Sequence, residues 1–288
     1  MFGPRRGDFM ATRSDALVAL GKVVDSKAKK HAQLRSGGLE IVASQGGHSA
    51  WAFDVVSIDG QPLAVTAVLS NTDDIWSVSA AALAATPTTR QVKAEAAKDA
   101  IVPPGGVAAG KAAPGTDAAV DKFRKGLVDQ QSWGDDLASR TDAIVVGPAA
   151  GQVTRGKQAI KKLWKARTKS NVREATSGEL AAALTPDGQL VWLSVPVTRV
   201  ADDEDAMPLR IFAVYEKDGA GWKLIALHEA LAFDEPGSGA PFKKILPPAP
   251  APPEPAKVVP AEGKPDESAA ATKKPKKKKK PKPRPADD

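Results

Sequence analysis

Side chains able to do acid–base chemistry are scarce in this chain of 288 residues, which has three histidines, one tyrosine and no cysteine. Proton abstraction beside a carbonyl group needs at least a base and a group that stabilises the oxyanion. His228 is the foremost candidate, with Tyr215 and Asp142 as further candidates. We expect His228 to lie on a strand, where it faces either a ligand pocket or a neighbouring sheet.

Complete catalytic or metal-binding motifs are missing from the sequence. It contains no H-E-x-x-H, no G-x-S-x-G, no G-x-x-x-x-G-K-[ST] and no dinucleotide fingerprint. The absence of cysteine excludes thiolate sites, and three scattered histidines argue against a metal site. We therefore assign no catalytic residue, no cofactor and no metal.

Trp133, Trp164 and Trp192 join His228 as candidates for lining a ligand pocket. Tryptophan stacks on ligands, but it is also a large core residue. Trp133 and Trp164 lie on or beside predicted helices, and Trp192 lies on a predicted strand. Core packing is the competing interpretation for all three.

The elements that would position these residues are clearest between residues 116 and 246. Apolar residues at helical spacing predict helices over 117–131 and 157–167, the first capped by Thr116. Apolar, β-branched runs separated by turn signals predict five strands. These cover residues 143–146, 180–184, 189–200, 208–216 and 222–233. Helices followed by an antiparallel meander indicate an α+β fold.

The first ninety residues repeat part of the second half. Residues 36–39 (SGGL) align with 177–180 (SGEL), and seven of 23 positions are identical between 62–84 and 208–230. We predict a tandem duplication whose first copy lacks the opening helix and strand, because its start is truncated or because it is a degenerate half-domain. The matched tryptophans are Trp51 with Trp192 and Trp76 with Trp222.

Composition divides the chain into four segments. Residues 91–115 are rich in Ala, Gly, Pro and Lys and predict a linker between a block at 1–90 and a block at 116–246. Residues 247–288 are Pro/Ala-rich and then Lys/Pro-rich. Such a segment buries too little apolar surface to offset its ordering entropy, so we predict a disordered tail.

The order of motifs in the second block resembles the SnoaL-like branch of the nuclear transport factor two-like (NTF2-like) superfamily. The resemblance covers about 116–235 well and 3–84 partly. It rests on TDAIVVGP at 141–148, followed by Gly151, Arg155-Gly156 and Ala159-Ile160, and on AVYE at 213–216 with GWKLI at 221–225 and His228.

This resemblance implies a cone-shaped α+β fold in which a curved antiparallel sheet packs on helices around a pocket. It also implies pairing through sheet faces. A tandem copy would then form a pseudo-dimer within one chain, or the chain would form a homo-oligomer.

The family includes ketosteroid-isomerase-like enzymes, cyclases, dehydratases and members with no known reaction, so the fold does not give the function. The oxyanion tyrosine of the isomerases lies on the first helix, and residues 117–131 contain none. We therefore expect a noncatalytic module that binds a small apolar ligand or serves in assembly. The alternative is a small-molecule isomerase, cyclase or dehydratase acting in the pocket of the second copy.

A second alternative concerns the net charge of +7, because nine of the 41 Lys and Arg residues lie between Lys273 and Arg284. Such a cationic tail would tether the protein to a polyanion, either nucleic acid or an anionic membrane, or would only solubilise it. The sequence shows no apolar run long enough for a membrane span and no secretory signal, so we expect a cytoplasmic protein. The candidate polyanion-binding residues are Lys273, Lys274, Lys276, Lys277, Lys278, Lys279, Lys280, Lys282 and Arg284.

Overall fold

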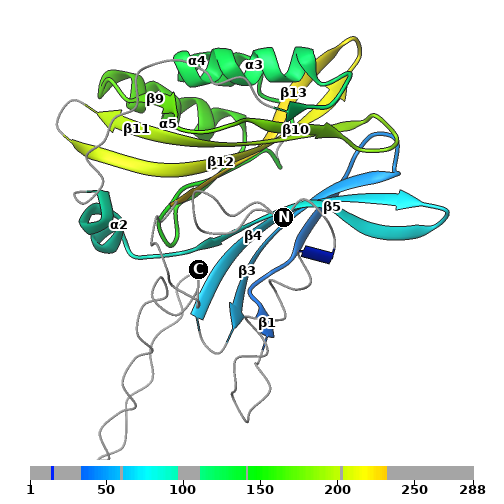
Figure 1. The fold of residues 1–288 in the computed structure, drawn as a ribbon, viewed down its shortest axis with the longest axis horizontal. Helices are drawn as coiled ribbons and strands as arrows, with labels where there is room; N and C mark the ends of the chain where they lie inside the picture. Colours follow the sequence, from blue (N-terminus) through cyan, green and yellow to red (C-terminus); the bar gives the residue numbers. More distant parts are fainter. Residues whose placement is uncertain are drawn as a thin grey trace, which may run out of the picture. The chain divides into compact units, whose positions relative to one another are not determined.

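Two sheets and a layer of helices make up the described part of the chain (Figure 1). The structure is a computed structural model that describes residues 14–15, 34–58, 61–96, 111–140, 142–201 and 204–231. The predicted tail at 247–288 lies outside these ranges. The described residues confirm the predicted α+β class, and both sheets are open and mainly antiparallel.

The first sheet contains five strands, in the order β1-β3-β4-β5, with β2 also pairing β3. The turn between β4 and β5 consists of Asp73 and Asp74, with φ angles of 52° and 61°. Two successive residues with positive φ fit a two-residue hairpin turn, and aspartate tolerates that conformation better than most residues. The strands are β1 (Leu34–Ser36), β2 (Glu40–Ala43), β3 (Ser49–Ile58), β4 (Gln61–Thr72) and β5 (Ile75–Ala85).

The second sheet contains eight strands, in the order β6-β10-β11-β12-β13-β7-β8, with β9 also pairing β11. Its centre is the predicted meander of three long strands. The short strands β6, β8 and β9 were not expected from the sequence. The strands are β6 (Lys111–Ala112), β7 (Ile144–Val146), β8 (Val153–Arg155), β9 (Arg173–Thr176), β10 (Ala181–Leu184), β11 (Leu190–Ala201), β12 (Glu204–Asp218) and β13 (Gly221–Leu231).

The helices differ from the prediction at two places. One helix predicted over 117–131 is instead α3 (Asp117–Val128) and α4 (Gln130–Asp135). The break occurs because Asp129 is extended and its side chain accepts a hydrogen bond from the Gln131 backbone N–H, which caps α4. Helix α5 (Lys157–Lys169) matches its prediction closely. None of the described helices is long and apolar enough to cross a membrane.

Helix α2 (Thr89–Ala96) extends into the segment predicted as a linker, and β6 lies in the same segment. The sequence signal for α2 is a capping box. The Thr88 backbone N–H donates to the Gln91 side chain at 2.9 Å, and the Gln91 backbone N–H donates to Thr88 Oγ1 at 3.3 Å.

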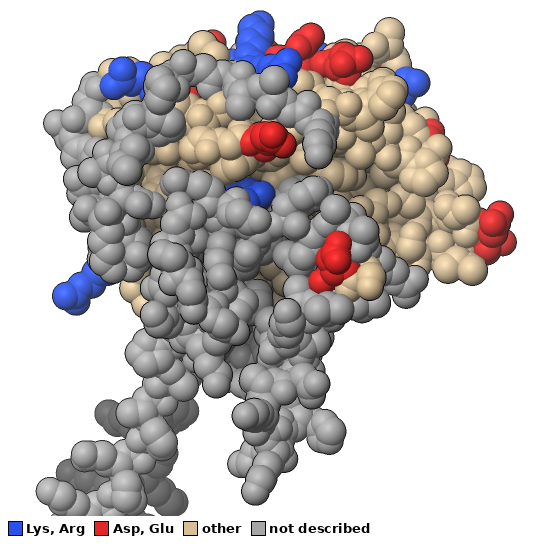
Figure 2. Space-filling view, viewed as in Figure 1, with Lys and Arg blue, Asp and Glu red and all other residues tan. Residues whose placement is uncertain are grey.

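The second sheet is buried on both faces. One face packs under α3, α4 and α5 through a core that includes Phe123, Trp133 and Trp164, each at most 1% exposed. The other face packs on the first sheet, where Trp51 and Val68 meet Phe212 among others. In the view of Figure 2, charged side chains of both signs lie along the top, where Figure 1 shows the helices, and further ones lie lower on the same face.

Candidate functional site

A cavity of about 430 Å³ lies between helices α2 and α5, the β7–β8 connection and the second sheet. Eight apolar side chains contribute to its lining: Val92, Val145, Pro148, Ala149, Val153, Leu163, Val172 and Met207. Its polar lining is provided by Thr89, Lys93, Gln152, Thr154, Arg167 and Arg199. Volume and composition are those of a site for a small organic molecule.

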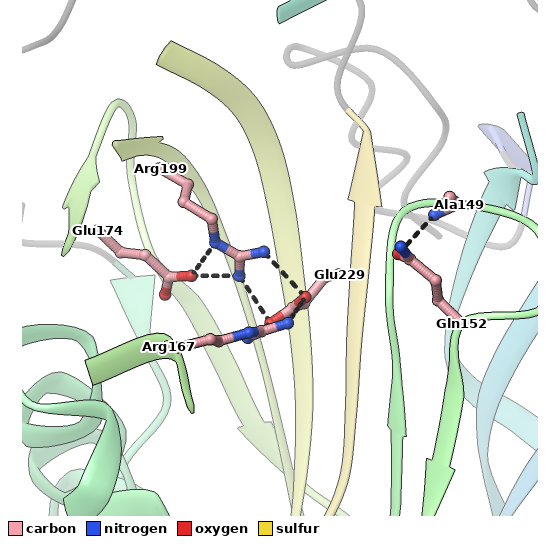
Figure 3. A network of polar contacts seen from close by, with 6 residues as sticks. All are labelled: Ala149, Gln152, Arg167, Glu174, Arg199 and Glu229. Atoms are coloured by element: carbon pink, nitrogen blue, oxygen red, sulfur yellow. Dashed lines mark hydrogen bonds and ion pairs between the residues drawn. The ribbon is translucent and has the colours of Figure 1, made fainter. Parts of the chain in front are cut away.

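Two arginines of the cavity wall belong to a buried ion-pair network (Figure 3). Arg199 on β11 donates from Nε to Glu174 Oε1 at 2.8 Å and from Nη2 to Glu229 Oε1 at 2.7 Å. Arg167, near the end of α5, donates from both terminal nitrogens to Glu229, at 2.5 and 2.7 Å. The network therefore ties α5, β9, β11 and β13 together at the wall of the cavity.

The two carboxylates of this network have opposite pKa shifts. Burial alone would raise the pKa of Glu229, but Arg167 and Arg199 lower it to about 2. For Glu174, burial outweighs the attraction of Arg199 and raises the pKa. Glu174 Oε2 also has no hydrogen-bond partner among the described residues. Glu229 is thus held as a carboxylate, which makes it a weak base.

His228 does not line the cavity. It is 1% exposed on β13, and its Nδ1 lies 2.9 Å from Thr66 Oγ1 on β4 of the first sheet. Glu229, the next residue along the strand, faces the helical side, as the alternation of a regular strand requires. His228 therefore lies between the two sheets, and its contacts are those of a structural residue.

The other candidate catalytic residues lie elsewhere. Tyr215 is fully buried in the core beneath the helices, where burial raises the pKa of its hydroxyl well above its usual value. Asp142 forms an ion pair with Arg140 at 2.9 Å, and Arg140 also reaches Glu216 at 2.7 Å. The structure thus does not bring Asp142, Tyr215 and His228 together.

The candidate tryptophans are absent from the lining of the 430 Å³ cavity. Trp133 and Trp164 pack against each other with ring centroids 5.8 Å apart in the core. Trp192 stacks on Phe212 on the face that meets the first sheet. The candidate lysines and arginine of the tail lie outside the described residues.

Sequence reasoning missed Arg167, Glu174, Arg199 and Glu229 as a group. Arg199 is the one charged residue within a long apolar strand of the printed sequence, and that position was the available signal for a buried charge. Within the described ranges, no cluster of three or more histidine or carboxylate side chains could hold a metal ion.

Comparison with known proteins finds similar folds among solved structures. No family model and no curated protein matches the chain. An NTF2-like protein of unknown function from Pseudomonas putida is similar, with 16% identity, a TM-score of 0.30, and coverage of 42% of this chain and 87% of that chain. A cystatin-like-fold protein of unknown function from Nostoc punctiforme has 16% identity and a TM-score of 0.31, covering 41% and 88%. A de novo designed protein with a curved β-sheet has 13% identity and a TM-score of 0.30, covering 40% and 98%.

Replacing Arg199 should be strongly destabilising, because Arg199→Met leaves Glu174 and Glu229 buried with one cation fewer. We expect a loss of about 3–5 kcal/mol in the free energy of unfolding, measured by urea denaturation at pH 7. Glu174→Gln is the matched control, since an amide oxygen still accepts from Arg199, and it should cost clearly less. A stability for Arg199→Met within about 1 kcal/mol of wild type would contradict the buried network.

His228 should make stability depend on pH. Burial, only partly offset by Glu229, lowers the pKa of His228 to about 4, against about 6.5 in the unfolded chain. Between these values the unfolded state binds the extra proton, so stability falls by about 3 kcal/mol as the pH drops from 6.5 to 4. His228→Gln should remove this fall, so the stability of the variant relative to wild type should rise as the pH drops from 6.5 to 4.5. Comparing the two proteins cancels the contribution of Glu174, whose raised pKa acts in the opposite direction in both. An unchanged slope would refute the assignment.

Proposed function

We propose that this protein is a noncatalytic NTF2-like module that binds a small, largely apolar molecule in the cavity beside Arg167 and Arg199. The observation that carries the proposal is the cavity itself, whose apolar side chains surround a space that the guanidinium groups of Arg167 and Arg199 border on one wall. The ligand would place its apolar body against residues such as Leu163 and Met207. One hydrogen-bond acceptor at its end would face the guanidinium groups.

The ion pairs that Arg167 and Arg199 already form limit the charge that a ligand can carry. Most donors of Arg199 already bind Glu174 and Glu229, and Arg167 binds Glu229 through both terminal nitrogens. A strongly anionic ligand would have to compete with these carboxylates in a buried place. A molecule with one weak acceptor, such as a carbonyl oxygen, would not.

The alternative, an isomerase, cyclase or dehydratase acting in this pocket, needs a base that faces the substrate. His228 contacts Thr66 instead, and the low pKa of Glu229 weakens it as a proton acceptor. These two placements favour binding over catalysis. A turnover assay with the purified protein and a β,γ-unsaturated ketosteroid, followed by the ultraviolet absorbance of the conjugated enone product, tests the isomerase arm of the alternative directly.

We also propose that the two sheets are copies of one module, paired face to face within the chain. Each long hairpin carries a β-bulge, one between Val68 and Leu69 opposite β5 and one between Val214 and Tyr215 opposite β13. These bulges fall at positions that the sequence alignment matches, since Val68 aligns with the identical Val214 and Leu69 aligns with Tyr215. Equal placement of such features supports common descent, because bulges are built into a strand rather than incidental.

Ligand binding is testable with the uncharged probe 6-propionyl-2-dimethylaminonaphthalene, an apolar ring system with one carbonyl acceptor, followed by isothermal titration calorimetry. Met207→Trp should fill the cavity and weaken binding at least about tenfold, roughly 1.4 kcal/mol. The matched control is Val128→Trp, since Val128 on α3 is 79% exposed and outside the cavity lining. Equal affinity of the two variants, or no binding by wild type, would count against the proposal.

Pairing of the copies within one chain has a consequence for assembly. Because one face of the second sheet is already covered by the first sheet, that face is closed to a second chain. Light scattering coupled to size-exclusion chromatography should give a mass near the monomer value of 30.0 kDa. A dimeric mass that persists on dilution would refute the intrachain pseudo-dimer.

A further inference from the structure

Helix α5 has an unusual charge content. Six of its 13 residues are Lys or Arg and none is acidic. Arg167 is turned inward to Glu229, so five lysines remain for the outer side. Helix α3, in contrast, mixes its basic residues with Asp117 and Asp121. The charge on α5 is therefore not compensated within the helix.

Four of these lysines are spaced four residues apart, and we call Lys157, Lys161, Lys165 and Lys169 the lysine ridge. Positions four apart are neighbours on one side of an α-helix, each about 6 Å further along the axis, so the ridge spans about 18 Å. The opposite side of α5 carries Ile160, which is fully buried in the core. Core packing fixes the direction in which the ridge points.

The ridge contributes little to the fold. Like charges four apart on a helix repel, and Lys157 in the first turn opposes the helix dipole, whereas only Lys169 in the last turn interacts favourably with it. Lys161 lies 3.6 Å from Asp135, whose side chain is 84% exposed, so this pair is weak. Lys165 and Lys169 have no ion pair with any described residue. A negatively charged partner would relieve this repulsion.

The positive surface continues past the start of α5. A hollow of about 780 Å³ lies there, lined by Lys157 and Lys161, the first two lysines of the ridge, and by two arginines that are already ion-paired. Arg140 pairs with Asp142 and Glu216, and Arg155 pairs with Glu40, so the two lysines supply the uncompensated charge of the hollow. Gly156 precedes the helix and supplies no side chain to cap its free backbone N–H groups. Backbone N–H groups at a helix start favour an anion, and here they add to a set of cationic side chains.

We propose that the lysine ridge and this hollow bind the phosphate backbone of a nucleic acid without base specificity. A row of lysines suits a linear polyanion, because each ammonium group neutralises a phosphate and releases a counterion. The exposed large apolar residues of the described part lie on β2 or directly before it, on β5 and on α3, and α5 has none. Stacking on bases and insertion into a bilayer are therefore not supported at this surface.

The proposal is tested with the full chain, fluorescein-labelled dT30 and a 30-base-pair duplex in a KCl series. The ridge variant carries Lys161→Gln, Lys165→Gln and Lys169→Gln. Its matched control also loses three cations, at exposed positions on three other elements: Arg90→Gln on α2, Lys125→Gln on α3 and Lys217→Gln on β12. The slope of log K against log[KCl] should become less steep by roughly 2 to 3 in the ridge variant and by less than 1 in the control.

Several outcomes would overturn the proposal. Equal slopes for the ridge and control variants would place any binding elsewhere, as in the lysine-rich C-terminal sequence that all variants keep. Ridge-dependent binding to phosphatidylserine vesicles or poly-glutamate, without binding to either oligonucleotide, would assign the surface to another partner. The ridge variant should melt at or slightly above the wild-type temperature, because repulsion is removed. A clear drop would show that the ridge serves the fold.

Discussion

The architecture of the second sheet depends on satisfying one charged side chain, Arg199, inside an apolar strand. The guanidinium group is buried, and a buried charge is tolerated only when it is paired and hydrogen-bonded. Glu174 and Glu229 provide that pairing, and Arg167 balances the second carboxylate. Because these four residues come from four different elements, the end of α5 and the short strand β9 must dock where they do.

The elements could largely be predicted, whereas the site could not. Long strands such as β11 and helix α5 have apolar runs or periodicity strong enough to be read directly. Strand β9 was not predicted because it has only four residues, two of them charged. Its position is fixed by the hydrogen bonds between Glu174 and Arg199 rather than by apolar packing. The ion-pair network was invisible because its members are 7 to 62 positions apart in the chain. Such proximity is a property of the tertiary fold and leaves no local pattern.

The position of His228 shows how burial on both faces changes the meaning of a strand residue. In a sheet with one wet face, alternation separates core from solvent. Here both sides are dry, so His228 and Glu229 are both buried, yet one meets Thr66 and the other meets two arginines. The alternation of a regular strand already requires that these neighbours face opposite ways. The sequence does not show which face of the sheet borders the cavity. The face on which His228 lies decides whether it can contact a ligand or only supports the packing of the two sheets.

Helix α2 follows the last strand of the first sheet, yet Val92 packs in the core of the second sheet and Lys93 lines the cavity. The Ala150 backbone N–H also donates to the Pro87 carbonyl at 2.8 Å. Residues from both halves of the chain therefore line the cavity. A fragment starting at residue 116 would lose one wall of its cavity and bare the surface now covered by Trp51 and Val68. The two halves are therefore a single structural unit, in which a substitution in one half alters the packing or the cavity of the other.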